Sequence, residues 1–249
     1  MDELVIGHPE PSFQAAVAAA VARVLDAHGI EAEFAAAPMA TLLDDLVAGR
    51  IDMIASVWSG QDGAAIAALD GQVEMLGALY QPQPMWCVQQ GAPAQTLDDL
   101  LRPEIRDALG GVVIDPGPSA PVAVREIFDA MGLGAAGWRL LGGGLSDLDA
   151  ACAAKANHVL PLWSPSAWTH GPDALRALAD PLGRLGGPQE ARLLVRAGWE
   201  ADPDLIDELS ELPLSNRIIG AMDRLMRDEG ATAEAAAEAW QRGRLSQRL

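Results

Sequence analysis

The amino-acid sequence predicts an α/β protein of two lobes, each a mainly parallel sheet flanked by helices. Three observations indicate this fold class. Short apolar runs alternate with longer helical stretches, which is the pattern of βαβ units. The alternation pauses at Gly91-Ala92-Pro93 and then starts afresh. The chain ends in a long helical tail after Asp202, and its 249 residues are enough to bury two modest cores.

The first block opens with an apolar run and closes before the pause. Its expected strands are 4–7, 31–36, 53–57, 73–79 and 85–88, and its expected helices are 13–28 and 39–48. The first of these helices is Ala-rich, and Gly29 follows it where a helix commonly ends in a left-handed residue.

The second block repeats the alternation. Its expected strands are 111–114, 138–141, 158–162 and 192–195, and its expected helices are 97–101, 121–131 and 146–155. In the helical tail, Pro203 lies near one helix start and Pro213 breaks the run. We therefore assign residues 1–90 plus 192–249 to one lobe and residues 91–191 to the other.

The charge and the ligand-type residues exclude several classes of protein. Lys and Arg number 17 against 35 Asp and Glu, a formal charge of −18 that repels a phosphate backbone, so nucleic acid is a poor partner. The four histidines and two cysteines show no metal-ligand spacing, and we expect no metal and no cofactor. Cys87 and Cys152 are either two buried thiols or a disulfide.

Catalytic motifs are also missing from the sequence. There is no G-x-S-x-G elbow, no Walker A loop, no G-x-G-x-x-G after the first strand and no H-E-x-x-H. Gly142-Gly143-Gly144 follows a strand, but no Lys-Ser/Thr comes after it, so it reads as a loop. Asp44-Asp45 and Asp98-Asp99 read as solvated helix faces. The sequence therefore predicts a protein that is not an enzyme.

The tryptophans point to a binding site. There are seven Trp against three Phe and one Tyr, which is an unusual choice for core packing. Trp58 and Trp163 follow predicted strands, where a cleft in an α/β protein is lined. An indole face attracts an ammonium group that carries methyl groups, and several faces form a cage. We expect ligand roles for Trp58 and Trp163, leave Trp86 and Trp168 open between ligand and core, and assign Trp138, Trp199 and Trp240 to the core.

A proline-rich turn offers amide donors for the anionic part of a ligand whose cationic part the tryptophans would bind. The segment from Asp115 to Pro121 joins a predicted strand to a predicted helix, and the amides of Gly117, Ser119, Ala120 and Val122 are available as donors. Free amides at a helix start favour an anion. The alternative is a plain capped helix. A cation cage opposite an anion-accepting turn would suit a zwitterion such as a betaine.

At these residues the sequence resembles the glycine betaine/choline substrate-binding proteins of ABC transporters. The similar segments are Ile114-Asp115-Pro116-Gly117, Leu162 to Trp168, Pro38-Met39 with Ala48 to Asp52 and Ser56-Val57-Trp58, Ala179-Asp180-Pro181, Val195 to Gly198, and Ala237 to Trp240. They follow the family's order along nearly the whole chain. The resemblance implies a type II periplasmic-binding-protein fold and ligand capture by closure of two lobes.

The sequence also departs from the family pattern. Where many members have a cage aromatic after the first strand, only His8 or Phe13 is present. Where many have a carboxylate-binding His after the equivalent of Trp58, this chain has Gln61 and Asp62. An Asp there would favour a more cationic ligand than glycine betaine, and Trp86 would rebuild the cage from another side.

The sequence thus predicts the substrate-binding component of an ABC importer for a quaternary-amine solute. The resemblance implies a membrane permease as partner, a monomer, and a periplasmic or otherwise extracytoplasmic location. The chain itself carries no secretory signal, and Leu4 to Gly7 reads as the edge of a mature domain. The alternatives are a ligand-sensing domain of the same fold and an enzyme on a similar scaffold.

Overall fold

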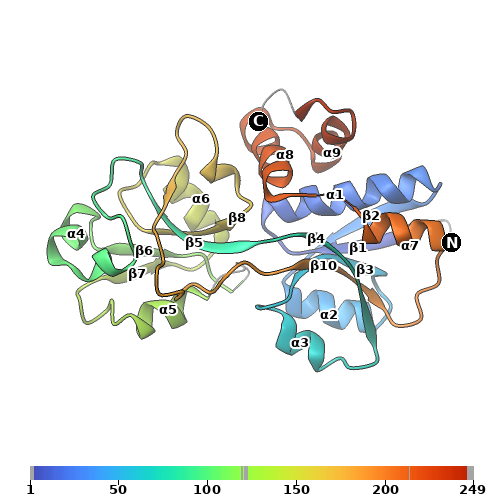
Figure 1. Ribbon diagram of the computed structural model, residues 1–249, viewed down its shortest axis with the longest axis horizontal. Coiled ribbons are helices and arrows are strands. Elements are labelled where there is room, and N and C mark those ends of the chain that lie inside the picture. Colours follow the sequence, from blue (N-terminus) through green and yellow to red (C-terminus); the bar gives the residue numbers. More distant parts are fainter. Residues whose placement is uncertain (1–2, 119, 121–122, 213, 246–249) are drawn as a thin grey trace. The chain divides into compact units, whose positions relative to one another are not determined.

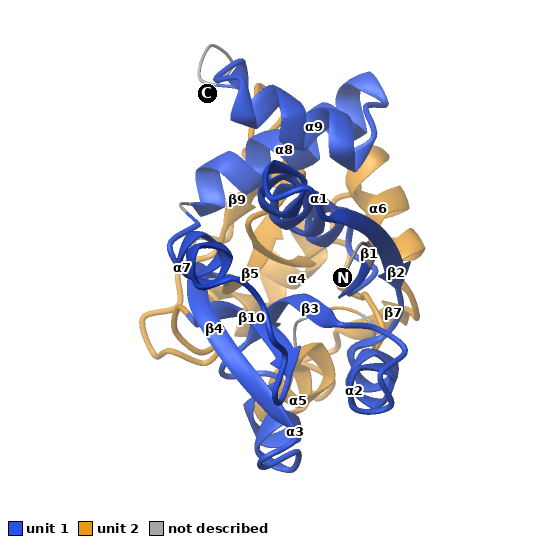
Figure 2. Cartoon of the chain, turned by 90° about the vertical axis from the view of Figure 1, so that its right-hand side faces the viewer, with its two compact units in different colours: residues 1–82, 189–249 blue, residues 83–188 orange. Residues whose placement is uncertain are grey.

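In the computed structural model, which describes residues 3–118, 120, 123–212 and 214–245, the chain divides into two compact units (Figure 2). Unit 1 comprises Met1–Pro82 and Gln189–Leu249, and unit 2 comprises Gln83–Pro188. The expected lobes are 1–90 plus 192–249 and 91–191, so the chain leaves unit 1 eight residues earlier than expected and returns three residues earlier. The first difference arises because β5 (Gln83–Val88) pairs with strands of unit 2.

Unit 1 is built on one five-stranded sheet in the order β2-β1-β3-β10-β4. The strands are β2 (Glu31–Ala36), β1 (Glu3–His8), β3 (Met53–Trp58), β10 (Ala191–Arg196) and β4 (Val73–Tyr80). β1 is parallel to β2 and to β3, whereas β10 is antiparallel to both of its neighbours. All six residues of β3 are buried, as expected of a central strand that reads as a continuous apolar run.

Helices cover both faces of this sheet (Figure 1). The helices of unit 1 are α1 (Ser12–Ala27), α2 (Met39–Val47), α3 (Gly63–Ala67), α7 (Pro203–Ser210), α8 (Asn216–Glu229) and α9 (Ala233–Gln241). The Ala-rich α1 contacts the sheet and also packs against α8 and α9, since its small side chains allow a close approach. On the other face, α2 contributes Leu42, Leu43 and Leu46 to a core cluster with Ile54 and Leu194.

Unit 2 has two smaller sheets. β5 pairs antiparallel with β8 (Leu160–Ser164) and β9 (Arg176–Ala177), and β6 (Val112–Asp115) pairs parallel with β7 (Arg139–Gly142). A parallel bridge between Val113 and Val159 joins the two sets. The helical elements are η1 (Asp98–Leu101), α4 (Pro103–Ala108), α5 (Val124–Ala130), α6 (Leu145–Ala153) and η2 (Ala167–Thr169).

The α/β class and most of the expected elements are confirmed, but the sheets are mixed and not mainly parallel. The reason is the same in both units: strands at or next to the crossings, β10 and β5, pair antiparallel with their neighbours. β8 extends to Ser164, so Trp163 lies inside the strand. α5 begins at Val124, whereas the expected start at Pro121 lies outside the described residues, as does Pro213.

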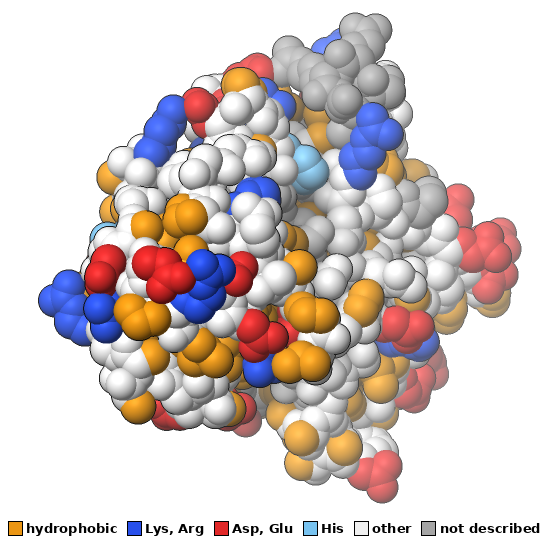
Figure 3. Space-filling model, turned by 60° about the vertical axis from the view of Figure 1, so that its left-hand side comes forward, with side chains coloured by type: hydrophobic (Ala, Val, Ile, Leu, Met, Phe, Trp, Pro, Cys, Tyr) orange, Lys and Arg blue, Asp and Glu red, His pale blue; other side chains and the backbone are white. Residues whose placement is uncertain are grey.

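Three further observations complete the fold. Cys87 and Cys152 are both buried and are not joined in a disulfide. No described helix is both long and apolar enough to span a bilayer. On the face shown in Figure 3, acidic and basic side chains lie interspersed.

Gly77 of β4 is a position where only glycine fits. A Cβ at Gly77 would lie 1.9 Å from the carbonyl oxygen of Ser210, at the end of α7. We expect Gly77→Ala to lower the free energy of unfolding by about 1–3 kcal/mol, because β4 and α7 must move apart. Thermal unfolding tests this, with Gly63→Ala as control since a Cβ there meets no atom within 4 Å. Equal melting temperatures for both variants would contradict the prediction.

Candidate ligand-binding site

The aromatic group of unit 1 is built around Trp58, the last residue of β3. Its indole Nε1 donates to Ser56 Oγ and to Tyr80 Oη, both at 3.2 Å. The Phe13 ring lies beside it, with centroids 6.3 Å apart and planes tilted by 39°. The Trp58 side chain is only 1% exposed. A ligand therefore reaches this ring only by replacing atoms that now cover it.

Asp62 holds the main chain of Trp58 in place. Its Oδ2 accepts a hydrogen bond from the Trp58 amide at 2.6 Å, and its own amide donates to the Trp58 carbonyl at 2.8 Å. Burial raises the pKa of the Asp62 carboxyl to about 6, although the bond from the Trp58 amide lowers it in part. The carboxyl is therefore mostly ionised at neutral pH and places a negative charge next to the aromatic group.

The loop after Trp58 is tied to the strand that re-enters unit 1. Gln189 Oε1 accepts from the amides of Gly60 and Gln61 at 3.0 Å each. The Ser59 amide donates to the Glu190 carbonyl, and the Glu190 amide donates back to Ser59 Oγ. The side chain of Gln61 is exposed, while its backbone amide is held by Gln189.

His8 ends β1 and is buried, with 7% of its surface exposed. Its Nδ1 donates to the Pro9 carbonyl oxygen at 2.8 Å. Burial lowers the pKa of the imidazole, although this hydrogen bond raises it in part. The ring is therefore neutral at pH 7, and Nε2 is then an acceptor and not a donor. His8 in this state cannot donate a hydrogen bond from Nε2 to a carboxylate.

In unit 2, two of the expected cage residues lie on one face of a β-ladder. Trp86 of β5 is paired with Pro161, and Trp163 of β8 is paired with Pro84. This register places Trp86 and Trp163 diagonally across the ladder on the same face, within reach of each other's large side chains. Both are buried, at 1% and 6% exposure.

Trp168 has a different environment. It belongs to η2, is half-buried, and its Nε1 donates to Asp149 Oδ1 of α6 at 3.1 Å. Of the expected core tryptophans, Trp138 is buried and donates to the Leu100 carbonyl at 2.7 Å. Trp199 and Trp240 are half-buried.

In the proline-rich turn of unit 2, two of the four amides expected to bind a ligand instead donate hydrogen bonds within the turn itself. The Gly117 amide donates to Asp115 Oδ1 at 2.9 Å, and the Ala120 amide donates to the Gly117 carbonyl at 3.3 Å. Ser119 and Val122 lie outside the described residues. Gly117 has φ +77°, and a Cβ there would lie 2.7 Å from the Gly143 carbonyl oxygen, so the turn requires glycine.

A hollow of about 260 Å³ adjoins this turn. Its lining includes Asp115, Gly117 and Arg125. The Asp115 carboxylate is 4% exposed and forms an ion pair with Arg125, whose side chain is exposed. An anion in this hollow would thus meet one cationic side chain together with the buried carboxylate of Asp115 and the exposed carboxylate of Glu126.

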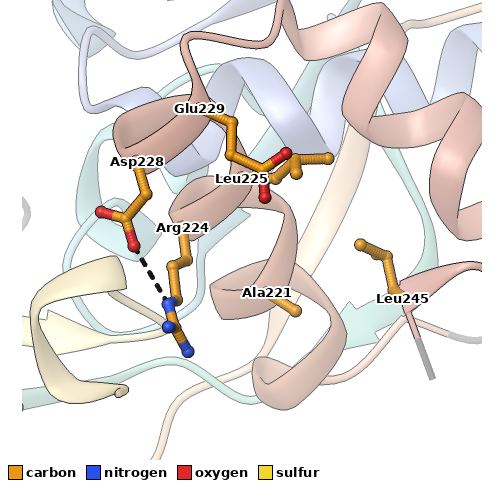
Figure 4. Close-up of a pocket in the computed structure, with 6 residues that line it drawn as sticks. All are labelled: Ala221, Arg224, Leu225, Asp228, Glu229 and Leu245. Atoms are coloured by element: carbon orange, nitrogen blue, oxygen red, sulfur yellow. Dashed lines mark hydrogen bonds and ion pairs between the residues drawn. The ribbon is translucent and has the colours of Figure 1, made fainter. Parts of the chain in front are cut away.

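Two other hollows contain none of the expected site residues. One of about 300 Å³ is lined by α8 and Leu245 (Figure 4), and its Arg224 and Asp228 pair with each other at 3.1 Å. Another of about 420 Å³ lies at the starts of β1 and β2, and its lining includes Trp199 and His28 together with the acidic residues Glu200 and Asp202. Over the described ranges, no three His, Cys, Asp or Glu side chains gather as a metal site.

Sequence reasoning missed Ser56, Tyr80, Gln14 and Gln189. Three of them had a weak signal: Ser56 is the one polar residue of an apolar strand, Tyr80 is the single Tyr of the chain, and Gln14 is an amide in an Ala-rich helical stretch. Gln189 had none. The side chain of Gln14 also hydrogen-bonds Tyr80. Only the fold shows that these residues surround Trp58.

Two α/β units with tryptophans on the strands of each define the class of two-lobed solute-binding proteins. The sequence model of the substrate-binding domain of ABC-type glycine betaine transport systems, OpuAC, matches residues 2–242. The chain belongs to this family, whose members are binding components of transporters and not enzymes.

Solved structures share the fold. Lactococcal OpuAC, closed on glycine betaine, superposes with a TM-score of 0.80 at 20% identity, over 99% of this chain and 97% of that one. The glycine betaine/L-proline-binding protein ProX of Borrelia burgdorferi gives 0.77 at 22% identity, over 95% and 91%. A choline-binding protein in complex with choline gives 0.76 at 19% identity, over 99% and 90%. Among curated proteins, none matches the sequence. The two-lobed periplasmic-binding-protein fold is thereby confirmed.

The buried carboxyl of Asp62 makes a pH-dependent contribution to stability. Its folded pKa of about 6 exceeds the ordinary value of about 3.9 in an unfolded chain. The folded state therefore binds the proton more tightly, and this contribution is complete below pH 4 and lost as the pH rises through 6. We expect the melting temperature of the wild type, relative to Asp62→Asn, to fall between pH 4 and 7. A difference that stays constant over this range would contradict the assignment.

Proposed function

We propose that this protein captures a small quaternary-amine solute for an ABC importer, and that the two units close on the ligand. The match to the glycine betaine transport family over residues 2–242 is the observation that supports a role in transport. The related structures hold glycine betaine in one case and choline in another. These two ligands share a trimethylammonium group, and that group is the chemistry we propose for this site.

The aromatic residues of each unit support a cation cage. Unit 1 would contribute Trp58 and Phe13, and unit 2 would contribute Trp86 and Trp163, with Trp168 beside them. A methylated ammonium donates no strong hydrogen bond, so electron-rich ring faces are its best partners. Each indole face contributes about 0.5–2 kcal/mol when it is desolvated.

The polar residues favour a more cationic ligand than glycine betaine. Asp62 is mostly ionised at neutral pH and lies against the Trp58 main chain. His8 is neutral, and the Gly117 and Ala120 amides donate within their own turn. A ligand carboxylate would therefore have to compete for these two amides. We place choline and related amines ahead of betaines.

The remaining parts of the proposal follow from the family. The protein would act outside the cytoplasmic membrane, as a monomer, and deliver its ligand to a membrane permease. Binding should first be measured by calorimetry against choline, glycine betaine, carnitine, proline betaine and trimethylamine N-oxide, with histidine and glutamate as controls. Saturable binding of at least one methylated amine supports the proposal. Binding of none, or of a control instead, overturns it.

The cage predicts a clear division among the tryptophans. Trp58→Ala and Trp163→Ala should each raise the Kd at least about tenfold, or about 1.4 kcal/mol, because each removes one ring face. Trp240→Ala should lower the melting temperature and leave the Kd unchanged, since Trp240 belongs to α9. Unchanged affinity in both cage variants, measured by calorimetry on folded protein, would rule the cage out.

The charge of Asp62 predicts selectivity between ligands. Asp62→Asn keeps an oxygen that can accept from the Trp58 amide but removes the negative charge. We expect the variant to lose affinity for choline, which is a net cation, more than for glycine betaine, which is a zwitterion. The ratio of the two Kd values measures the effect at pH 7.5. Equal changes for both ligands would show that Asp62 does not act on the ligand.

A further inference from the structure

Trp58 and Tyr80 are linked through a row of side chains that crosses three strands. In the sheet order β3-β10-β4, Ala191 of β10 is paired with Trp58 on one side and with Tyr80 on the other. Residues paired directly across a ladder point to the same face. The two large side chains therefore flank a single methyl group, and both can lean over it.

The two rings meet above Ala191 through their polar atoms. Trp58 Nε1 lies 3.2 Å from Tyr80 Oη and 3.2 Å from Ser56 Oγ, and the two hydroxyls hydrogen-bond each other. All of these residues are buried, with Ser56 at 0% and Tyr80 at 4% exposure. Because Nε1–H is the only donor of an indole, this pair of acceptors leaves the Trp58 ring with none.

The backbone of Ser56 is strained in a way that this contact explains. Ser56 has φ +71°, a left-handed conformation that is uncommon for a residue with a side chain. The register between β3 and β10 shifts at this point, so that Ala55 and Ser56 together face Leu193. Such bulges re-aim side chains next to functional sites. Here the bulge directs the Ser56 hydroxyl to the Trp58 indole.

Tyr80 keeps its proton over the physiological range. Burial raises the pKa of its hydroxyl, although hydrogen bonds from Ser56, Trp58 and Gln14 lower it in part. A neutral phenol can accept from the indole and donate to a neighbour at the same time. The hydrogen-bonded group is therefore electrically neutral and does not itself attract a cation.

We propose that Ser56 and Tyr80 are positioning residues: they fix the plane of the Trp58 indole and occupy its only donor. Trp58 then offers a ligand a π-face and no hydrogen bond, which suits a methylated ammonium and gives no advantage to a carboxylate or an amide. This inference rests on the proposed function, since it assigns the selectivity of the same site. It adds that this selectivity depends on two hydroxyls that need not contact the ligand.

The test is a double-mutant cycle with tetramethylammonium and choline as probes. Tyr80→Phe removes one hydroxyl, and Trp58→Phe keeps a ring but removes the N–H. We expect Tyr80→Phe to raise both Kd values about fivefold, the usual cost of one hydrogen bond, in the wild-type background. In the Trp58→Phe background it should have no further effect. A merely structural role would weaken binding equally in both backgrounds and overturn the proposal.

Ser56 gives a second pair of variants. Ser56→Gly removes the hydroxyl and relieves the strain at φ +71°, whereas Ser56→Ala removes the hydroxyl and keeps the strain. If the hydroxyl is what matters, both variants raise the Kd. If Ser56→Gly binds as tightly as the wild type, the hydroxyl does not position Trp58.

Nuclear magnetic resonance separates this inference from the proposed function. The seven tryptophans should give seven indole N–H signals, and Trp58→Phe identifies that of residue 58. Tyr80→Phe should shift this signal and speed its exchange with water, while Trp138, whose indole donates to Leu100, serves as internal control. If no probe binds the wild type but the signal shifts, the function fails and the positioning stands. An unmoved signal overturns the positioning.

Discussion

The insertion of β10 between β3 and β4 is the constraint on which the aromatic group around Trp58, the candidate site of unit 1, depends. β10 begins just after the chain returns from unit 2, and it runs antiparallel to the two strands beside it. Its first residue, Ala191, has the smallest apolar side chain that still carries a Cβ, and it is completely buried. A bulkier residue there would separate Trp58 from Tyr80. The returning strand therefore completes the sheet and sets the spacing of the aromatic group at once.

The same return segment also controls the loop after Trp58. Gln189 donates its amide to the Pro82 carbonyl, where the chain leaves unit 1, and its side chain accepts from Gly60 and Gln61. The outgoing crossing, the returning crossing and the loop are thus joined by one residue of unit 1. A shift of the crossing backbone at Gln189 would be transmitted to this loop within a few ångströms. These local hydrogen bonds would be enough to couple the crossing at Gln189 to the loop after Trp58.

Much of the fold could be predicted from the sequence because the apolar periodicity is strong, as in the Ala-rich α1 and the apolar β3. The pairing direction of β10 could not, since a short apolar run reads the same in a parallel and an antiparallel ladder. The aromatic residues were visible from their type and their place at strand ends. Their partners were not. Ser56 lies 24 residues from Tyr80, and only a register set by β10 and by a bulge in β3 brings the two hydroxyls together.

The chemistry of the candidate site follows from the hydrogen bonds that its polar groups already make within the protein. In unit 1 the indole donor of Trp58 is taken by Ser56 and Tyr80, its amide by Asp62, and the imidazole donor of His8 by Pro9. Each of these bonds removes a group that would otherwise stabilise an anionic or strongly hydrogen-bonding ligand. What remains next to Trp58 is aromatic surface and one ionised carboxylate. If the proposed ligand binds there, such a surface would discriminate by the hydrogen bonds it withholds as much as by those it offers, because the indole donor of Trp58 is already taken.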